Sequence, residues 1–325
     1  RALGIRVNEP LPREYDGTGP GMFLRTPEGA DFANSDFHAQ EVMNGTRNKL
    51  LLAYRAVWFH LLNEGILRTG TANSDSHGLT DSILGTPRNV VWAATSLDFF
   101  DPDEFNAAVR SGHVLGTNGP VIELRTTDSA GGIRGPSLEA FEPGDAAALS
   151  IRVVAAPWVP VEEVRVIING AVARSFSAEL RHPEDPLGTD GLVRFEGQVD
   201  LSDLLPADGR DSWVVVEAGS FLPMNGDLDC DGVPDTGDNN GDGQVDWRDV
   251  DWNGDDVVDA TDIEGRSDPG RCFETVGPEG APTEPEPGDP GYEFWAVTPQ
   301  GYPFAFTNPL LLDRDGEDFS GPGVP

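Results

Sequence analysis

Positive charge is scarce in this sequence. Lysine and arginine together number 22 against 56 aspartate and glutamate residues, so the chain of 325 residues carries a formal net charge of -34. A surface this acidic repels the phosphates of nucleic acids and the headgroups of anionic lipids. We therefore expect no nucleic-acid partner, and cations are the natural ligands.

Long hydrophobic runs and cysteines are also lacking. No apolar run approaches the roughly 20 residues that cross a bilayer, so no membrane insertion is expected. Two cysteines, Cys230 and Cys272, are too few for a disulfide-built scaffold, but one bridge between them could form in an oxidising compartment. The sequence starts at Arg1, which indicates a removed leader or a piece of a longer polypeptide. These features favour a secreted, extracellular or periplasmic protein.

The hydrophobic pattern predicts helices first and strands afterwards. Apolar residues recur every three or four positions from Thr46 to Glu64, which predicts a helix. Asp101 followed by Pro102 predicts the start of a second helix, and Asn169-Gly170 predicts a tight hairpin. The runs expected to form strands of an antiparallel sandwich are His113–Arg125, Leu149–Ala156, Glu163–Asn169, Ala171–Ser177, Val193–Leu201, Ser212–Ala218, Tyr292–Thr298 and Phe304–Leu312.

An aspartate-rich insertion interrupts the strands. Residues 227–262 hold thirteen aspartates and one arginine, and three 12-residue windows fit the calcium-loop template. The alternative is a solvated acidic linker, but the repeated spacing favours two or three calcium ions. The segment resembles thrombospondin type 3 repeats and dockerin loops. The predicted calcium ligands are Asp227, Asp229, Asp231, Val233, Asp235, Asp238, Asn240, Asp242, Gln244, Asp246, Asp249, Asp251, Asn253, Asp255, Val257, Asp259 and Asp262.

A second candidate site centres on Asp75 and His77 in a loop of small residues. Side chains two positions apart can reach one metal ion, and small neighbours allow close approach. A direct hydrogen bond between the two side chains in a turn is the alternative reading.

Several segments together resemble the polymerase-and-histidinol-phosphatase (PHP) superfamily, in its carbaryl-hydrolase-like branch. They are Glu41-Val42-Met43-Asn44-Gly45, Ser74-Asp75-Ser76-His77, Gly85-Thr86-Pro87-Arg88-Asn89-Val90, Phe105–Gly112, Gly116–Pro120, Pro157-Trp158, Val164–Val166 with Asn169-Gly170, and Ala305–Leu310. Val7-Asn8-Glu9-Pro10 resembles a family segment with Glu9 in the place of a ligand histidine.

The resemblance implies a fold, a metal site and a reaction. The implied fold class is α/β plus β: the C-terminal part of a distorted (β/α) barrel, followed by an antiparallel β-sandwich with the calcium-loop insertion. The implied ligands of zinc, manganese or iron are Asp75 and His77, then Glu41 and Glu9. The implied reaction is hydrolysis of phosphoesters, or of related esters and amides, by a metal-bound hydroxide. The sequence contains no H-x-H pair, which supplies the family's first ligands.

These observations divide the chain and leave two functions open. The expected parts are 1–125, a partial PHP-type region; 126–224, a β-sandwich; 225–275, the calcium insertion; 276–291, a proline-rich linker; and 292–325, the final strands and tail. One hypothesis is the C-terminal portion of a secreted metallohydrolase, partnered by its own N-terminal half or by identical subunits. The other is a non-catalytic extracellular structural or binding protein that calcium makes rigid.

Calcium removal should expose the insertion before the sandwich unfolds. Ion binding there contributes folding free energy, so a calcium chelator should speed proteolysis within residues 225–275 while the strands stay intact. Limited proteolysis with mass mapping, with and without calcium added back, measures this. Equal cleavage of the insertion in chelator and in calcium would contradict the calcium assignment.

Overall fold

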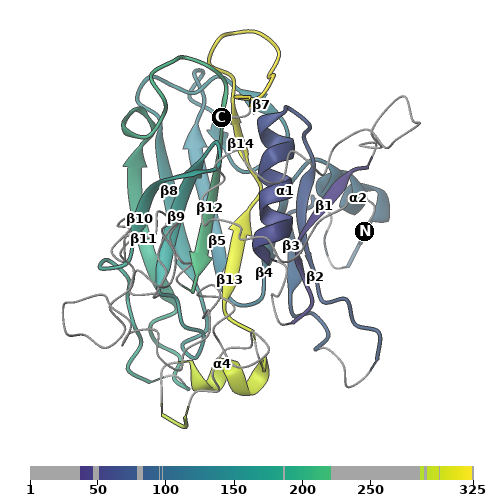
Figure 1. Ribbon diagram of the computed structural model, residues 1–325, viewed down its shortest axis with the longest axis vertical. Helices are drawn as coiled ribbons and strands as arrows, with labels where there is room; N and C mark the ends of the chain where they lie inside the picture. The colour runs from purple at the N-terminus through teal and green to yellow at the C-terminus, as the bar shows by residue number, and fades with distance from the viewer. Residues whose placement is uncertain are drawn as a thin grey trace, which may run out of the picture.

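The chain folds as stacked layers in the computed structural model (Figure 1). The structure describes residues 37–46, 51–78, 83–94, 96, 98–185, 187–220, 286–288, 291–299 and 301–323. Within these residues a four-stranded sheet packs on an eight-stranded sheet, whose other face is covered by a helix and a small parallel sheet. No helix of the described part is long and apolar enough to span a membrane.

The eight-stranded sheet forms the middle layer. Its main path runs β10 (Ala171–Phe176), β9 (Glu163–Ile168), β12 (Ser212–Gly219), β13 (Phe304–Thr307), β4 (Val114–Thr117) and β3 (Arg88–Val91). Beside β12 lies β14 (Leu310–Leu312), which pairs with β7 (Ala140–Phe141). All pairings on the main path are antiparallel, and the predicted hairpin at Asn169-Gly170 is confirmed by the β9–β10 register.

The outer sheet follows the order β11 (Val193–Asp200), β8 (Ala148–Val154), β5 (Val121–Thr127) and β6 (Ile133–Arg134). Its strands alternate buried and exposed side chains, because only one face meets the middle layer. Ile122, Leu149 and Ile151 from this sheet share one core with Val164 and Val216 from the middle sheet. Burial of this apolar surface is the main stabilising contribution to the pairing of the two sheets.

Strands β9 and β12 are buried along their whole length. Ile167, Trp213 and Val215 point away from the four-stranded sheet and pack with Trp58 and Phe59 of α1 (Leu51–Asn63). In Figure 1 this helix stands between the sandwich strands and β1 (Ala39–Asn44). Strands covered on both faces read as continuous apolar runs, which explains the sequence of β12.

The helix connects two parallel strands. β1 pairs in parallel with β2 (Thr69–Asn73), so β1, α1 and β2 form a β–α–β unit. The far edge of β2 carries no further strand among the described residues. Instead, the Asn89 amide bonds both the N–H and the carbonyl of Ala72, each at 2.8 Å. The Asn308 amide does the same for Gly70, at 2.8 and 3.0 Å.

The predicted (β/α) barrel, and with it the predicted fold class, is wrong. The described residues are mostly β, with three α-helices and open sheets. A barrel needs successive β–α units whose edges pair until the sheet closes. Here one parallel unit is followed by antiparallel strands, and asparagine side chains occupy the edge of β2 where a next strand would add.

The other two helices, α2 and α4, can be compared with what the local sequence predicted for their segments. α2 (Pro102–Arg110) begins as predicted, with the Asp101 carboxylate accepting from the Asp103 N–H at 2.8 Å. The strand expected at Tyr292–Thr298 is wrong, because α4 (Tyr292–Val297) occupies that segment. Its only fully buried side chain, Phe294, anchors the helix in the core between the two sheets.

Four charged side chains are buried between α1 and the middle sheet. Arg55 of α1 donates to Glu217 of β12 at 2.5 and 3.1 Å. Arg165 of β9 also donates to Glu217, at 3.1 Å, and to Glu163 at 2.6 Å. The side chains of all four are at most 2% exposed. Each of the four charges has an oppositely charged partner, which offsets the cost of burial, although Arg165 Nη2 makes no hydrogen bond.

Glu217→Gln should therefore destabilise the protein strongly. The amide would leave two buried guanidinium groups facing a neutral partner, with an expected loss of about 3–5 kcal/mol of unfolding free energy. Glu123→Gln is the matched control, because the Glu123–Arg152 pair at 3.0 Å is 45% and 38% exposed and should contribute less than about 1 kcal/mol. Denaturant unfolding measures both, and equal losses would refute the role of the buried network.

Candidate functional site

Three of the predicted transition-metal ligands come from the β1–β2 pair. Glu41 lies in the middle of β1, and Asp75 and His77 lie in the segment after β2. Parallel pairing brings the carboxyl ends of the two strands to the same edge, since Asn44 is opposite Asn73. In parallel sheets this edge is the usual place for ligands. Glu9, the fourth predicted ligand, lies outside the described residues.

The charges of both carboxylates influence Tyr54 of α1. Burial raises the pKa of the Tyr54 phenol, and the negative charges of Glu41 and then Asp75 raise this pKa further. A charge influences a pKa appreciably only at short range. Glu41 acts from β1 and Asp75 from the segment after β2, and both raise this pKa.

The Asp75–His77 pair is exposed and self-contained. His77 Nε2 lies 2.7 Å from Asp75 Oδ1, and the two side chains are 79% and 48% exposed. Asp75 has a φ of 49°, a left-handed conformation that aspartate tolerates better than most residues. The direct contact between Asp75 and His77, which was the alternative interpretation of this motif, is therefore present.

Glu41 is held by amide donors. Its two oxygens accept from Asn73 Nδ2 at 2.7 Å and from Asn44 Nδ2 at 3.0 Å. Carboxylates and imidazole together form a donor set that zinc, manganese and iron accept. The donor atoms of Glu41, Asp75 and His77 do not all lie within 4.8 Å of one another, so the three do not form a closed ligand group by themselves.

Another acidic group does converge. Within the described part of the chain, one set of three potential ligands has its atoms within 4.8 Å of one another: Asp211, Asp313 and Asp315. This group, which we term the aspartate triad, could hold a metal ion. Asp211 precedes β12 and is buried, whereas Asp315 is exposed. The ladder that pairs Ser212 with Leu312 brings the adjacent Asp211 and Asp313 together.

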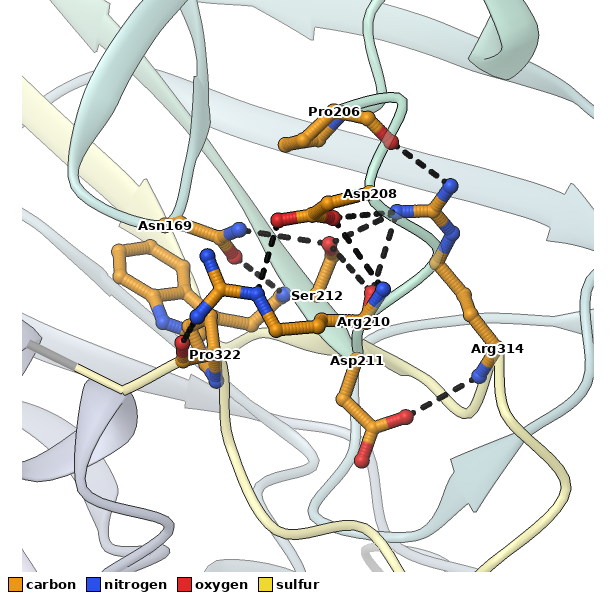
Figure 2. Close-up of polar contacts among 9 residues, drawn as sticks. Asn169, Pro206, Asp208, Arg210, Asp211, Ser212, Arg314 and Pro322 are labelled. Carbon is orange, nitrogen blue, oxygen red and sulfur yellow. Dashed lines mark hydrogen bonds and ion pairs between the residues drawn. The ribbon is translucent and has the colours of Figure 1, made fainter. Parts of the chain in front are cut away.

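Hydrogen bonds orient Asp211, the buried member of the triad, and Figure 2 shows its contact with Arg314. Asp211 accepts from the backbone N–H groups of Arg314 and Ser320 at 3.1 and 2.9 Å. The Arg314 side chain reaches away, to the carbonyls of Pro206 and Arg210 at 2.8 and 3.1 Å (Figure 2). Its guanidinium thus extends toward the loop before β12, on the side opposite the Asp211 carboxylate.

Sequence reasoning missed this triad. Asp313-Arg314-Asp315-Gly316 has the D-x-D-G spacing of a short oxygen-ligand loop, and this signal was available. The third member, Asp211, is distant in sequence and is placed only by the β12–β14 pairing. The predicted calcium ligands within 227–262, together with Cys230 and Cys272, lie outside the described residues.

The remaining histidines do not join either site. His60 is buried inside α1, and burial lowers the pKa of its imidazole. His38, His113 and His182 are exposed.

Comparison of the chain with protein-family models, curated proteins and solved structures gave no match. The resemblance to the PHP superfamily therefore stays a prediction.

A divalent cation should protect the end of the chain if the triad binds one. Three neighbouring carboxylates repel one another, and a cation between them relieves that repulsion. Hydrogen exchange of peptides covering 306–323 should slow on addition of calcium or manganese. Asp315→Asn should abolish this protection, while Glu317→Gln, at an exposed neighbouring position, should keep it. Equal responses in the two variants would contradict binding at the triad.

Proposed function

We propose that this chain contributes part of the active site of a secreted metal-dependent hydrolase. Glu41, Asp75 and His77 would be its metal ligands, with further ligands supplied by Glu9 or by an upstream portion of the same protein. The supporting observation is the β1–α1–β2 unit, in which Glu41 on β1 is hydrogen-bonded to Asn73 at the carboxyl end of β2, and Asp75 and His77 follow that end.

The chemistry of the residues agrees with this role. A bound divalent metal would supply Lewis acidity for hydrolysis of a phosphoester, ester or amide. Glu41 would bind it with an orientation set by Asn44 and Asn73. His77, at 79% exposure, has room to turn toward a ligand, and Asp75 is next to it. The open arrangement of the three donors agrees with a site that other parts of the protein complete.

A second candidate function rests on the aspartate triad. A convergent, oxygen-only ligand group suits calcium better than zinc or iron. It supports a non-catalytic extracellular protein that calcium makes rigid, through the triad and through the aspartate-rich residues 227–262.

Metal analysis and hydrolysis assays separate the two proposals. The protein, purified together with any upstream portion of the same polypeptide, should hold zinc, manganese or iron near stoichiometry and cleave p-nitrophenyl phosphate or p-nitrophenyl acetate. His77→Ala should lower both metal content and turnover by more than about tenfold, because it removes an imidazole ligand. His113→Ala, at another exposed histidine, is the control and should change neither.

The opposite outcome favours the second proposal. Calcium alone, with no transition metal and no hydrolysis in a sample that includes any upstream portion, would overturn the hydrolase assignment. Peptide mapping of the same sample would show whether an upstream portion co-purifies. If such a portion is present and the sample still lacks transition metal and activity, missing ligands cannot explain the result.

A further inference from the structure

A chain of side-chain amides leads from the backbone of β2 to Glu41. Asn89, on β3, is fixed to Ala72 by two hydrogen bonds of 2.8 Å. Its Nδ2 also donates to Asn73 Oδ1 at 3.2 Å. Asn73 Nδ2 in turn donates to Glu41 Oε1 at 2.7 Å and to Thr71 Oγ1 at 3.3 Å.

The backbone of β2 decides which way each amide points. The Ala72 N–H can only donate, so it requires the oxygen of Asn89, and the Ala72 carbonyl requires the nitrogen. With Asn89 Nδ2 thus directed, Asn73 must present its oxygen to Asn89. The Asn73 nitrogen is then left for Glu41. The reverse orientation of Asn73 would place its oxygen against a carboxylate oxygen, which is repulsive.

The network leaves Glu41 able to bind a cation. Each carboxylate oxygen can accept about two hydrogen bonds, and the two oxygens of Glu41 accept one amide donor each, from Asn73 and Asn44. One lone pair per oxygen therefore remains. Hydrogen-bond donors of this kind fix the orientation of a ligand without occupying its binding position.

We propose that Asn89 and Asn73 are positioning residues for Glu41. Asn89 transmits the geometry of β2 to Asn73, and Asn73 holds the Glu41 carboxylate in the orientation used for metal binding. This inference rests on the proposed hydrolase function. It goes beyond that function because it assigns roles to Asn89 and Asn73, and neither of these residues is a metal ligand.

Asn308 provides a matched control for the structural role. It bonds the Gly70 N–H and carbonyl, as Asn89 bonds those of Ala72 on the same strand edge. Its Nδ2 donates further to the Val114 carbonyl at 2.8 Å, away from the amide chain to Glu41. Asn308→Ala should thus destabilise β2 without changing the orientation of Glu41.

The test is Co²⁺ binding to the metal-free protein, purified together with any upstream portion of the same polypeptide, followed by the visible absorption of the bound ion. Excess calcium fills the oxygen-only sites, so that the signal reports a site with an imidazole ligand. His77→Ala should abolish it. Asn89→Ala and Asn73→Ala should each weaken Co²⁺ binding by about 10- to 100-fold, whereas Asn308→Ala should leave the dissociation constant unchanged. In a Glu41→Gln background, Asn89→Ala should have no further effect, because it acts through Glu41.

The outcomes separate the two proposals. No Co²⁺ binding by the wild-type protein in this preparation, or equal binding by His77→Ala, would overturn the hydrolase proposal and this inference with it. His77-dependent binding that Asn89→Ala and Asn73→Ala leave as tight as Asn308→Ala would overturn the positioning role alone. If Asn89→Ala does not fold, Asn73→Ala decides the matter, since Asn73 is exposed and does not clamp the backbone of β2.

Discussion

Glu217 is a carboxylate buried in the middle of a protein, and two arginines from different elements must reach it at once. Arg55 comes from α1, and Arg165 comes from the neighbouring strand β9. The cost of burying these charges is offset only when every partner is in place. These ion pairs therefore favour one position of α1 on the sheet. Because β1 and β2 are connected to α1, this position also places the β1–α1–β2 unit. The edge that holds Glu41, Asp75 and His77 inherits its position from this ion network.

Asparagine side-chain amides form hydrogen bonds with strand backbone groups that a further strand would otherwise form. Asn89 and Asn308 close the edge of β2, and Asn118 bonds the Phe304 N–H and the Tyr302 carbonyl, both at 2.7 Å. A carboxamide has the same donor and acceptor as a peptide group, so it can end a sheet without leaving backbone groups unpaired. At β2 the same amide that closes the edge also faces Asn73. Termination of the sheet and organisation of the candidate site are thus achieved by one side chain.

Local signals in the sequence were reliable where the structure depends on neighbours in the chain. The start of α2 at Asp101-Pro102 and the hairpin at Asn169-Gly170 needed only local hydrogen bonds and backbone preferences. The apolar residues of segment 292–297 fit both the period of a strand and that of a helix, so the sequence did not distinguish the two. Burial of Phe294 between the sheets favours the helix. The prediction of a barrel was wrong for a similar reason, since strand pairing beyond β2 depends on side chains distant in sequence.

The sequence by itself determined the strong negative charge and, through its resemblance to the PHP superfamily, suggested Glu41, Asp75 and His77 as candidate ligands. Tertiary structure alone decided that β12 is covered on both faces, that Asn89 reaches Asn73, and that Asp211 meets Asp313 and Asp315. Composition and short motifs are properties of consecutive residues. Contacts between distant residues depend on strand order and register, which are selected by packing and by the pairing of buried charges.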